Sequence, residues 1–312
     1  MCTAITFRAH HRLFGRTLDL EHDYGERIIR IPSDRPLHFR HLPAMKEHHA
    51  ILGMALDFPE LPLIFDGMND SGLAAAGLNF PHSAHYFASA PEGSLPLASF
   101  ELIPYLLASC ATIDQARAAL ERITILDTPH SEALPPSPLH WMITDGLHSL
   151  VAEPMENGLA LFDNPVGILT NEPPFPHQLY ALSSCLHLSP APQQNFLGID
   201  LAPYASYSRG MGAIGLPGDS SSTSRFVRAA FTAACASPGE STEEDIAQFY
   251  HIAAAAAQVK GCVRLEDGSE VRTVYTSCCD LDAGDIMWSG MSVGSCFGRL
   301  CDIRKGLAAA IR

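Results

Sequence analysis

Short runs of alternating apolar and polar residues dominate the first third of the chain and recur after residue 139. This period of two is typical of strands with one buried face, because successive side chains point to opposite faces of a sheet. The pattern predicts strands at 3–8, 12–19, 25–31, 50–56, 62–66, 72–79, 139–144, 148–153, 158–162, 166–170 and 272–279. Short turns join the first three strands, so we expect a hairpin that returns the strand at 12–19 beside residue 2.

Segments with helical spacing lie between these strands. They are residues 97–110, 111–123, 223–236 and 241–260. Two of them open with a capping box, Thr112 with Gln115 and Ser241 with Glu244. Many hairpin-connected strands and a few grouped helices predict an α+β fold in which helical layers cover sheets, and not a parallel βαβ series.

Two regions depart from these patterns. Residues 183–218 have no periodicity and predict a long loop. In the tail, 289–312, the glycines Gly290, Gly294 and Gly298 weaken any strand. A chain of 312 residues is long enough to bury a large core, and we interpret 1–312 as a single domain.

The composition narrows the choice of partners and compartment. The net charge is −14 and no run of Lys or Arg occurs, which argues against nucleic acid and anionic membranes. No apolar stretch approaches the roughly 20 residues that span a bilayer. His10, His11 and Arg12 interrupt the N-terminus too early for a signal peptide, so we expect a cytoplasmic protein.

Cofactor and metal chemistry lack support in the sequence. The chain has neither a GxGxxG motif nor a Walker loop. The nine cysteines are an odd number, which excludes a complete intrachain disulfide set. Cys278 and Cys279 are adjacent, without the spacing of a zinc knuckle, and with Cys296 and Cys301 we interpret them as core packing. We therefore expect no metal and no organic cofactor.

Residue 2 is the first candidate for chemistry. In MCTAITF a cysteine follows the initiator methionine, and cysteine is small enough for aminopeptidase trimming. The mature chain would then begin with a residue that carries both a thiol nucleophile and an α-amine, whose reference pKa near 8 suits proton transfer. Taken alone, Cys2 is better explained as a buried cysteine on a first strand.

Five further polar residues lie in apolar or tight segments. Arg16 and Asp19, in FGRTLD, would lower the thiol pKa and hold the α-amine, although such a pair is often an exposed ion pair. Asn79 and Asn171 stand before turns, where the amide either donates to an oxyanion or bonds local backbone. Arg225 follows the segment LPGDSSSTS.

Together these stretches resemble the choloylglycine hydrolase family of the N-terminal nucleophile (Ntn) hydrolases, which contains the bile salt hydrolases and the penicillin V acylases. The matching stretches run in family order and are MCTAITF, LFGRTLDLE, FDGMNDSGLAAAGLNFP, SPLHWMITD, NPVGILTNEPPF, YSRGMGAIGLPGDSSSTSRFVRAAF and VYTSCCDLDAGD. The tail departs from the family, whose members usually end in an aromatic strand of the Tyr-x-Asn type.

The resemblance implies a four-layer αββα sandwich and amide hydrolysis through a thioester on Cys2. It implies that Asp19 bonds the α-amine and that Arg16 and Arg225 polarise the thiol and hold Asp19. Asn171 and Asn79 would orient the amine and supply the oxyanion hole together with backbone N–H groups. Many family members are homotetramers assembled partly through the loop that matches 183–218.

The resemblance also bears on the substrate. Asn79 stands where many bile salt hydrolases have asparagine and well-known penicillin V acylases have tyrosine, which favours conjugated bile salts. We expect Leu18, Phe58, Phe65 and Leu134 to line the sterol pocket, although each is equally compatible with ordinary core packing. Penicillin V and N-acyl homoserine lactones are alternative substrates. A catalytically silent binding protein is the remaining alternative, since an uncleaved Met1 would block the amine.

Overall fold

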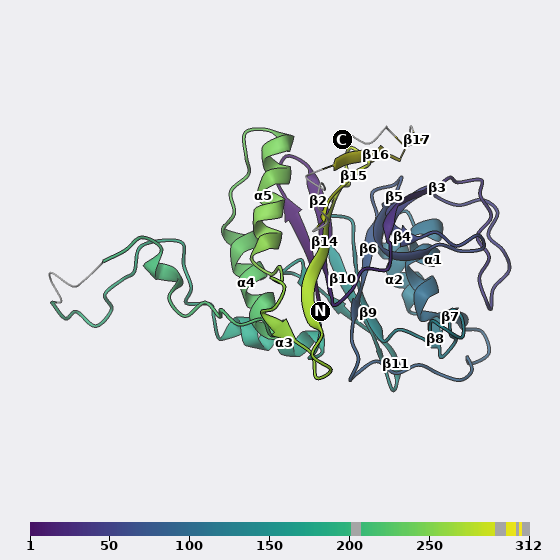
Figure 1. The fold of residues 1–312 in the computed structure, drawn as a ribbon, viewed down its shortest axis with the longest axis horizontal. Coiled ribbons are helices and arrows are strands. Elements are labelled where there is room, and N and C mark those ends of the chain that lie inside the picture. The colour runs from purple at the N-terminus through teal and green to yellow at the C-terminus, as the bar shows by residue number, and fades with distance from the viewer. Residues whose placement is uncertain (201–206, 291–297, 304–305, 308–312) are drawn as a thin grey trace.

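The computed structural model describes residues 1–200, 207–290, 298–303 and 306–307. Two large sheets pack face to face, and helices cover the outer face of each (Figure 1). Strands β1 (Cys2–Arg8) and β2 (Arg12–Leu20) of one sheet contact β5 (Leu63–Asn69) and β6 (Ala74–Asn79) of the other. The four layers confirm the predicted αββα sandwich.

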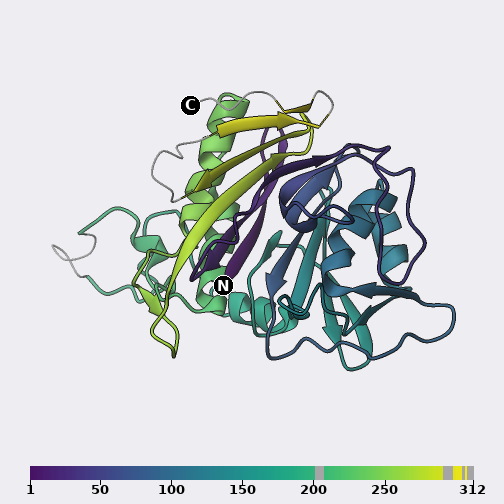
Figure 2. The same ribbon diagram turned by 45° about the vertical axis from the view of Figure 1, so that its right-hand side comes forward.

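The first sheet carries the N-terminus, and all its neighbouring strands are antiparallel. Its order is β12 (Ile168–Leu169), β1, β2, β14 (Glu270–Asp280), β15 (Asp285–Gly290), β16 (Gly298–Asp302) and β17 (Gly306–Leu307), and β13 (Val263–Arg264) pairs with β14. In Figure 2 the purple N-terminal strands lie beside the yellow-green C-terminal ones. Cys2 pairs with Leu18, and Leu18 pairs with Tyr275, so β2 and β14 are the nearest neighbours of residue 2 on this side.

A glycine, Gly15, permits β2 and β14 to approach each other closely near Cys2. A Cβ atom on Gly15 would lie 1.9 Å from the main-chain oxygen of Ser277, a distance that no side chain tolerates. The absence of a side chain at Gly15 therefore permits the close approach of β2 and β14, and its neighbour Arg16 donates its main-chain N–H to Ser277.

The second sheet is also antiparallel throughout. Its order is β11 (Gly158–Asp163), β10 (Ser149–Met155), β9 (Leu139–Thr144), β6, β5, β4 (Ile51–Leu56) and β3 (Arg27–Ile31). Because successive side chains point to opposite faces, residues of this sheet contribute to two hydrophobic cores, one between the sheets and one under the helices. Met54, Met68 and Leu78 face the first sheet, whereas Ile51 and Ile64 pack under helices on the outer face.

Five α-helices are present in the described ranges. Helices α1 (Leu102–Ser109) and α2 (Ile113–Leu120) cover the second sheet, while α4 (Ser222–Cys235) and α5 (Thr242–Ala254) cover the first, and α3 (Phe175–Ser183) packs on α4. One half of each predicted capping box is present, because the side chains of Thr112 and Ser241 accept from the main-chain N–H of Gln115 and Glu244. The side chains of Gln115 and Glu244 accept instead from the residue before the cap, Ala111 and Glu240. The proline-rich start of α3 concealed that helix from the sequence analysis.

Three predicted helices extend too far. The predicted helix 97–110 begins with β7 (Leu95–Ala98) and a 3-10 turn, Ser99–Glu101, and the prediction for 111–123 runs into β8 (Ile123–Leu126), which pairs in parallel with β7. Helix α5 ends at Ala254 instead of residue 260. The main-chain N–H of Gln258 donates to the hydroxyl of Thr273 at 2.7 Å, and the main-chain N–H of Thr273 donates to the oxygen of Gln258 at 3.0 Å. These two bonds hold the chain against β14.

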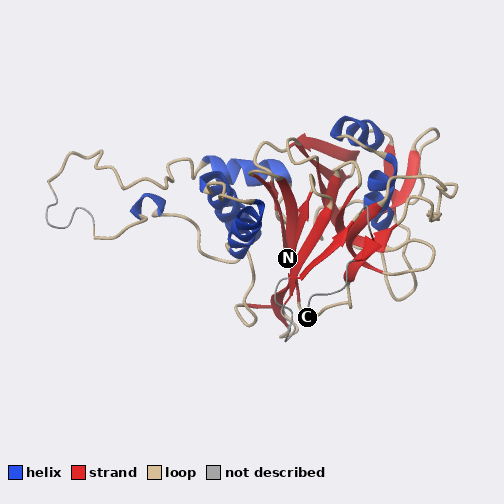
Figure 3. Ribbon diagram, turned by 90° about the horizontal axis from the view of Figure 1, so that it is seen from above, coloured by secondary structure: helices blue, strands red, loops and turns tan. Residues whose placement is uncertain are grey.

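The long loop and the tail complete the fold. Ser183 ends α3, and apart from the 3-10 turn Met211–Ala213 the described residues from 184 to 218 are irregular and project from the helical layer (Figure 3). In the tail, Gly290 ends β15 and Gly298 begins β16, so the two glycines lie at strand ends and not inside a strand. Gly294 lies outside the described residues, as does Cys296. Among the described helices, none is long and apolar enough to cross a membrane.

Cys278 and Cys279 are both fully buried in β14, as the core interpretation predicts. Burial raises the pKa of each thiol well above its usual value, so neither is a reactive cysteine at neutral pH. The side chain of Cys301 lies outside the description. Across the described ranges, no three His, Cys, Asp or Glu side chains are grouped as metal ligands.

Candidate active site

Cys2 lies at the start of β1 with only 2% of its surface exposed. Its sulfur is 2.5 Å from Nη2 of Arg16, and its main-chain nitrogen donates to Oδ1 of Asn171 at 2.8 Å. One residue therefore has a guanidinium at its sulfur and a side-chain acceptor at its nitrogen. A positive charge beside a thiol stabilises the thiolate, which is the nucleophilic form.

Arg16 reaches the sulfur from β2 and is 1% exposed. Its Nη1 donates to the main-chain oxygen of Gly77 at 2.6 Å, and its Nε to that of Thr17 at 3.4 Å. Burial opposes the charged form, but the nearby Cys2, Tyr275, Asp66 and Asp19 raise the pKa of Arg16. The guanidinium is therefore charged.

Asp19, also on β2, is fully buried. Its carboxylate accepts from the hydroxyls of Thr273 at 2.6 Å and Thr17 at 3.0 Å, and its main-chain oxygen accepts from the amine of Met1 at 2.6 Å. Burial raises the pKa of Asp19, while the charge of Arg225 opposes this. An exposed ion pair between Arg16 and Asp19, the alternative left open by the sequence, is wrong because both side chains are buried.

Asn171 connects the parts of the site. Its Oδ1 accepts from Cys2 and from Nη2 of Arg225, the latter at 2.7 Å, and its Nδ2 donates to the main-chain oxygen of Asn79 at 2.8 Å. Ser222 and Gln178 hold its backbone, through bonds of 2.8 and 2.6 Å. Neither was found from the sequence, because polar residues near a helix start have no distinctive spacing.

Asn79 ends β6 and is half-buried. Its side-chain amide makes no hydrogen bond to any described residue, in contrast to the amide of Asn171. An amide in this condition is available to donate to a substrate oxygen.

Arg225 enters from the first turns of α4 and is fully buried. Its Nη1 donates to the main-chain oxygen of Cys2 at 2.6 Å and to the hydroxyl of Thr3 at 2.7 Å. Burial lowers the pKa of Arg225, and the charges of Asp19 and Cys2 oppose this. Its hydrogen bonds thus go to β1, Asn171 and the main-chain oxygen of Ser220, and only its charge reaches Asp19.

The four residues expected in an acyl pocket fall into two groups. Leu18 pairs with Cys2 and is buried, and the main-chain oxygen of Phe65 lies 3.4 Å from Nη1 of Arg16, so both are next to the site. Tyr24, which the sequence analysis missed, stacks on Phe65 with 6.2 Å between ring centroids. Tyr24 lies in a polar loop, where the sequence has no apolar pattern that would indicate a buried or pocket-lining residue.

Phe58 and Leu134 form the second group. The ring of Phe58 is 4.4 Å from that of His130, and the main chain of Leu134 bonds that of His130. Phe58 and His130 line a cavity of about 230 Å³ together with Arg40. No described contact joins Phe58 or Leu134 to Cys2.

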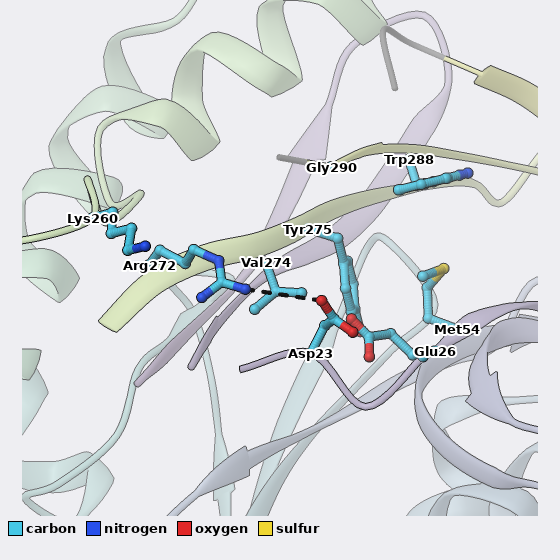
Figure 4. A pocket seen from close by; sticks show the side chains of 10 residues that line it. Asp23, Glu26, Met54, Lys260, Arg272, Val274, Tyr275, Trp288 and Gly290 are labelled. Carbon is cyan, nitrogen blue, oxygen red and sulfur yellow. Dashed lines mark ion pairs between the residues drawn. The ribbon is translucent and has the colours of Figure 1, made fainter. Parts of the chain in front are cut away.

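A larger cavity, of about 560 Å³, opens beside Tyr275 (Figure 4). Its lining consists of Asp23, Gly25, Glu26, Met54, Lys260, Arg272, Val274, Tyr275, Trp288 and Gly290. Arg272 and Asp23 form an ion pair of 3.9 Å across it. None of the four expected pocket residues belongs to this lining.

The model of one protein family, described as linear amide C–N hydrolases of the choloylglycine hydrolase family, matches residues 2–289. The chain belongs to this family. It is 41% identical over 286 residues to a bile salt hydrolase/transferase of Lactiplantibacillus plantarum, a match that covers 91% of this chain and 87% of the relative. A bile salt hydrolase/transferase of Clostridium perfringens is 33% identical, with 91% and 87% covered.

Solved structures agree with this family assignment. A variant of the conjugated bile acid hydrolase of Clostridium perfringens superposes with a TM-score of 0.88 at 30% identity, covering 97% of this chain and 93% of the other. A penicillin V acylase of Agrobacterium tumefaciens superposes with a TM-score of 0.74 at 19% identity, covering 94% and 84%, and shares the fold. The sandwich is therefore the Ntn hydrolase fold that the resemblance implied.

Proposed function

We propose that this amide hydrolase cleaves glycine- or taurine-conjugated bile salts through an N-terminal Cys2 and releases the bile acid and the amino acid. The observation that carries the proposal is the position of Cys2, with Arg16 at its sulfur and Asn171 at its nitrogen. The substrate class rests on relatives named bile salt hydrolases that align with nine-tenths of the chain.

The proposed reaction needs only groups of this chain and one water. Removal of Met1 turns the nitrogen of Cys2 into an α-amine, which stays within reach of Asn171 Oδ1. The α-amine takes the proton of the Cys2 thiol, the thiolate attacks the acyl carbon, and the amide of Asn79 donates to the oxyanion. The C–N bond breaks as the α-amine protonates the leaving nitrogen, and the same amine then deprotonates the water that cleaves the thioester.

A parallel hydrolysis panel tests the substrate class. Glycocholate, taurocholate, penicillin V and a long-chain N-acyl homoserine lactone are assayed with the processed protein under one set of conditions. We expect the highest kcat/KM for the two bile salts. A higher value for penicillin V or the lactone contradicts the bile salt assignment, and loss of all four activities in protein lacking Met1 supports a silent binding protein.

Replacement of Phe65 with alanine tests the acyl pocket. Loss of this apolar surface, at roughly 25 cal/mol per Å², removes about 1–2 kcal/mol of binding, so KM for glycocholate and taurocholate is expected to rise about tenfold alike. Phe58→Ala is a matched control, since Phe58 contacts His130 and not the Cys2 site. A change for one conjugate alone would place Phe65 at the amino-acid end, and no change would make it ordinary core.

We also propose a cytoplasmic homotetramer. The projecting loop has strongly exposed apolar side chains at Phe196, Leu197 and Tyr207, with 88%, 81% and 80% of their surface accessible. Apolar surface of this kind is typical of a protein interface. Light scattering of the purified protein tests the assembly, because a monomeric mass at micromolar concentration contradicts it.

A further inference from the structure

Arg16 is a buried charge, and apart from the sulfur of Cys2 its side chain donates only to neutral main-chain oxygens. Besides the sulfur of Cys2, its guanidinium donates to the main-chain oxygens of Thr17, Phe65 and Gly77. Within the described residues, no carboxylate lies close enough to form an ion pair with it. A guanidinium removed from water in this way requires a compensating charge nearby, or it moves towards solvent.

Asp66 on β5 is the carboxylate in position to compensate this charge. It is fully buried, and the Tyr275 hydroxyl donates to its Oδ1, while the hydroxyl of Ser277 donates to its Oδ2 at 2.6 Å. The same Ser277 oxygen accepts from the main-chain N–H of Arg16 at 3.1 Å. Ser277 thus bridges Asp66 to the backbone that carries the guanidinium.

Each of the buried carboxylates Asp19 and Asp66 has a buried arginine as the strongest influence that lowers its pKa. Burial raises the pKa of Asp66, and the charge of Arg16 is the strongest opposing influence. For Asp19 the corresponding influence on the pKa is the charge of Arg225. Asp19 also acts on Arg16, but Ser277 links Asp66 directly to the Arg16 backbone, since its hydroxyl donates to Asp66 and accepts from the Arg16 main-chain N–H.

We propose that Asp66, held by Tyr275 and Ser277, is a positioning residue that keeps the Arg16 guanidinium charged and fixed against the sulfur of Cys2. Asp66 touches neither Cys2 nor a substrate and acts through Arg16. Its attachment spans both sheets, because Asp66 lies on β5 and its two donors lie on β14. This proposal rests on the proposed function of Cys2.

The sign of the change in Cys2 reactivity separates positioning from a direct effect of charge. If Asp66 acted on Cys2 only through space, removal of its negative charge would make the thiolate easier to form and lower the thiol pKa. If Asp66 keeps Arg16 in place, its removal frees the guanidinium from the sulfur and raises the thiol pKa. The charged or titratable groups that face Asp66 are Arg16, Tyr275, Cys279 and Glu26, and those that face Cys2 are Arg16 and Arg225. All of them remain present in both cases.

The experiment measures, as a function of pH, the rate at which iodoacetamide alkylates Cys2 in the wild-type protein and in Asp66→Asn. Mass spectrometry of the N-terminal peptide gives the rate, and the exposed Cys235 is the internal reference. We expect the Cys2 profile to shift upward by about one pH unit. For bile salt hydrolysis we expect kcat to fall about 10- to 100-fold while KM changes little. A downward shift, or no shift with wild-type kcat, overturns the proposal.

Two more variants make the result specific. Asp245→Asn removes another fully buried carboxylate, which lies on α5 and accepts from His10 and the main-chain N–H of Gly239. This variant is expected to leave the Cys2 profile unchanged. An equal shift in Asp245→Asn overturns the proposal. Should Asp66→Asn not fold, Tyr275→Phe removes one donor to Asp66 but keeps the ring, and we expect the same upward shift at smaller size.

Alkylation needs no substrate, so this test is independent of the substrate class. If the wild-type protein hydrolyses no bile salt, the proposed function fails while the alkylation profiles still decide the role of Asp66. If hydrolysis is normal but the profile of Tyr275→Phe or Asp66→Asn moves downward, the role of Asp66 fails alone.

Discussion

Replacement of Cys2 with alanine or serine is expected to abolish amide hydrolysis and to leave the fold intact. Alanine has no nucleophile, and a serine hydroxyl is a much weaker one at neutral pH, so kcat should fall by about 10⁴-fold or more. Cys2 is 2% exposed but small, and the loss of its sulfur should change the free energy of unfolding by about 1 kcal/mol, a shift of a few degrees in Tm.

Hydrolysis of glycocholate and thermal unfolding, measured on the same preparations, check this result. Cys110→Ala is a matched control, because Cys110 is also a buried cysteine but belongs to the outer core under α1. It should lose some stability and keep its activity. A Cys2→Ala protein that retains a tenth or more of the wild-type rate would rule out the nucleophile assignment.

Much of the fold could be predicted from the sequence because its strands have one buried face. Strands β1 and β2 have the period of two that this environment produces, and their hairpin places Leu18 beside Cys2 as expected. The helix ends were less predictable. Ala254 ends α5 because Gln258 binds Thr273 on a distant strand, and no local signal at residue 254 records that contact.

In the site too, residues with a local sequence signal could be predicted, and residues placed by distant contacts could not. Cys2 and Arg16 could be identified because they stand in matching family stretches, whose order along the chain is specific. Ser222 and Gln178 bind the backbone of Asn171, and Asp66 accepts from Tyr275 and Ser277. In three of these four hydrogen bonds the partners are 50 or more residues apart. Such contacts depend on how the two sheets and α4 meet, which residue spacing alone does not encode.

The pocket residues show a third case. Leu18 and Phe65 lie beside the site, since one pairs with Cys2 and the other bonds Arg16 through its carbonyl oxygen. Phe58 lies on a loop against His130, and an aromatic residue on a loop has no preferred direction that a sequence pattern reveals. The shape of an acyl pocket therefore follows from loop packing more than from composition.

An untrimmed residue before Cys2 is expected to silence the enzyme even though the thiol remains. With Met1 attached, the nitrogen of Cys2 is an amide that donates to Asn171, and Met1 exchanges main-chain hydrogen bonds of 2.6 and 2.9 Å with Asp19. An amide nitrogen neither accepts a proton from the thiol nor gives one to the leaving group. Loss of this acid–base step should reduce kcat about 10²- to 10⁴-fold.

The experiment inserts leucine between Met1 and Cys2, because a large residue in that position prevents removal of the methionine. Its partner is the same chain with a removable N-terminal tag, which protease treatment converts to a protein that begins at Cys2. Intact mass establishes each N-terminus, and hydrolysis of glycocholate gives the rate. We expect activity to appear only when the mass corresponds to a free Cys2. Full activity in the leucine variant, with its extra residues still attached, would show that the α-amine is not the proton shuttle, and the Ntn mechanism proposed for this chain would be wrong.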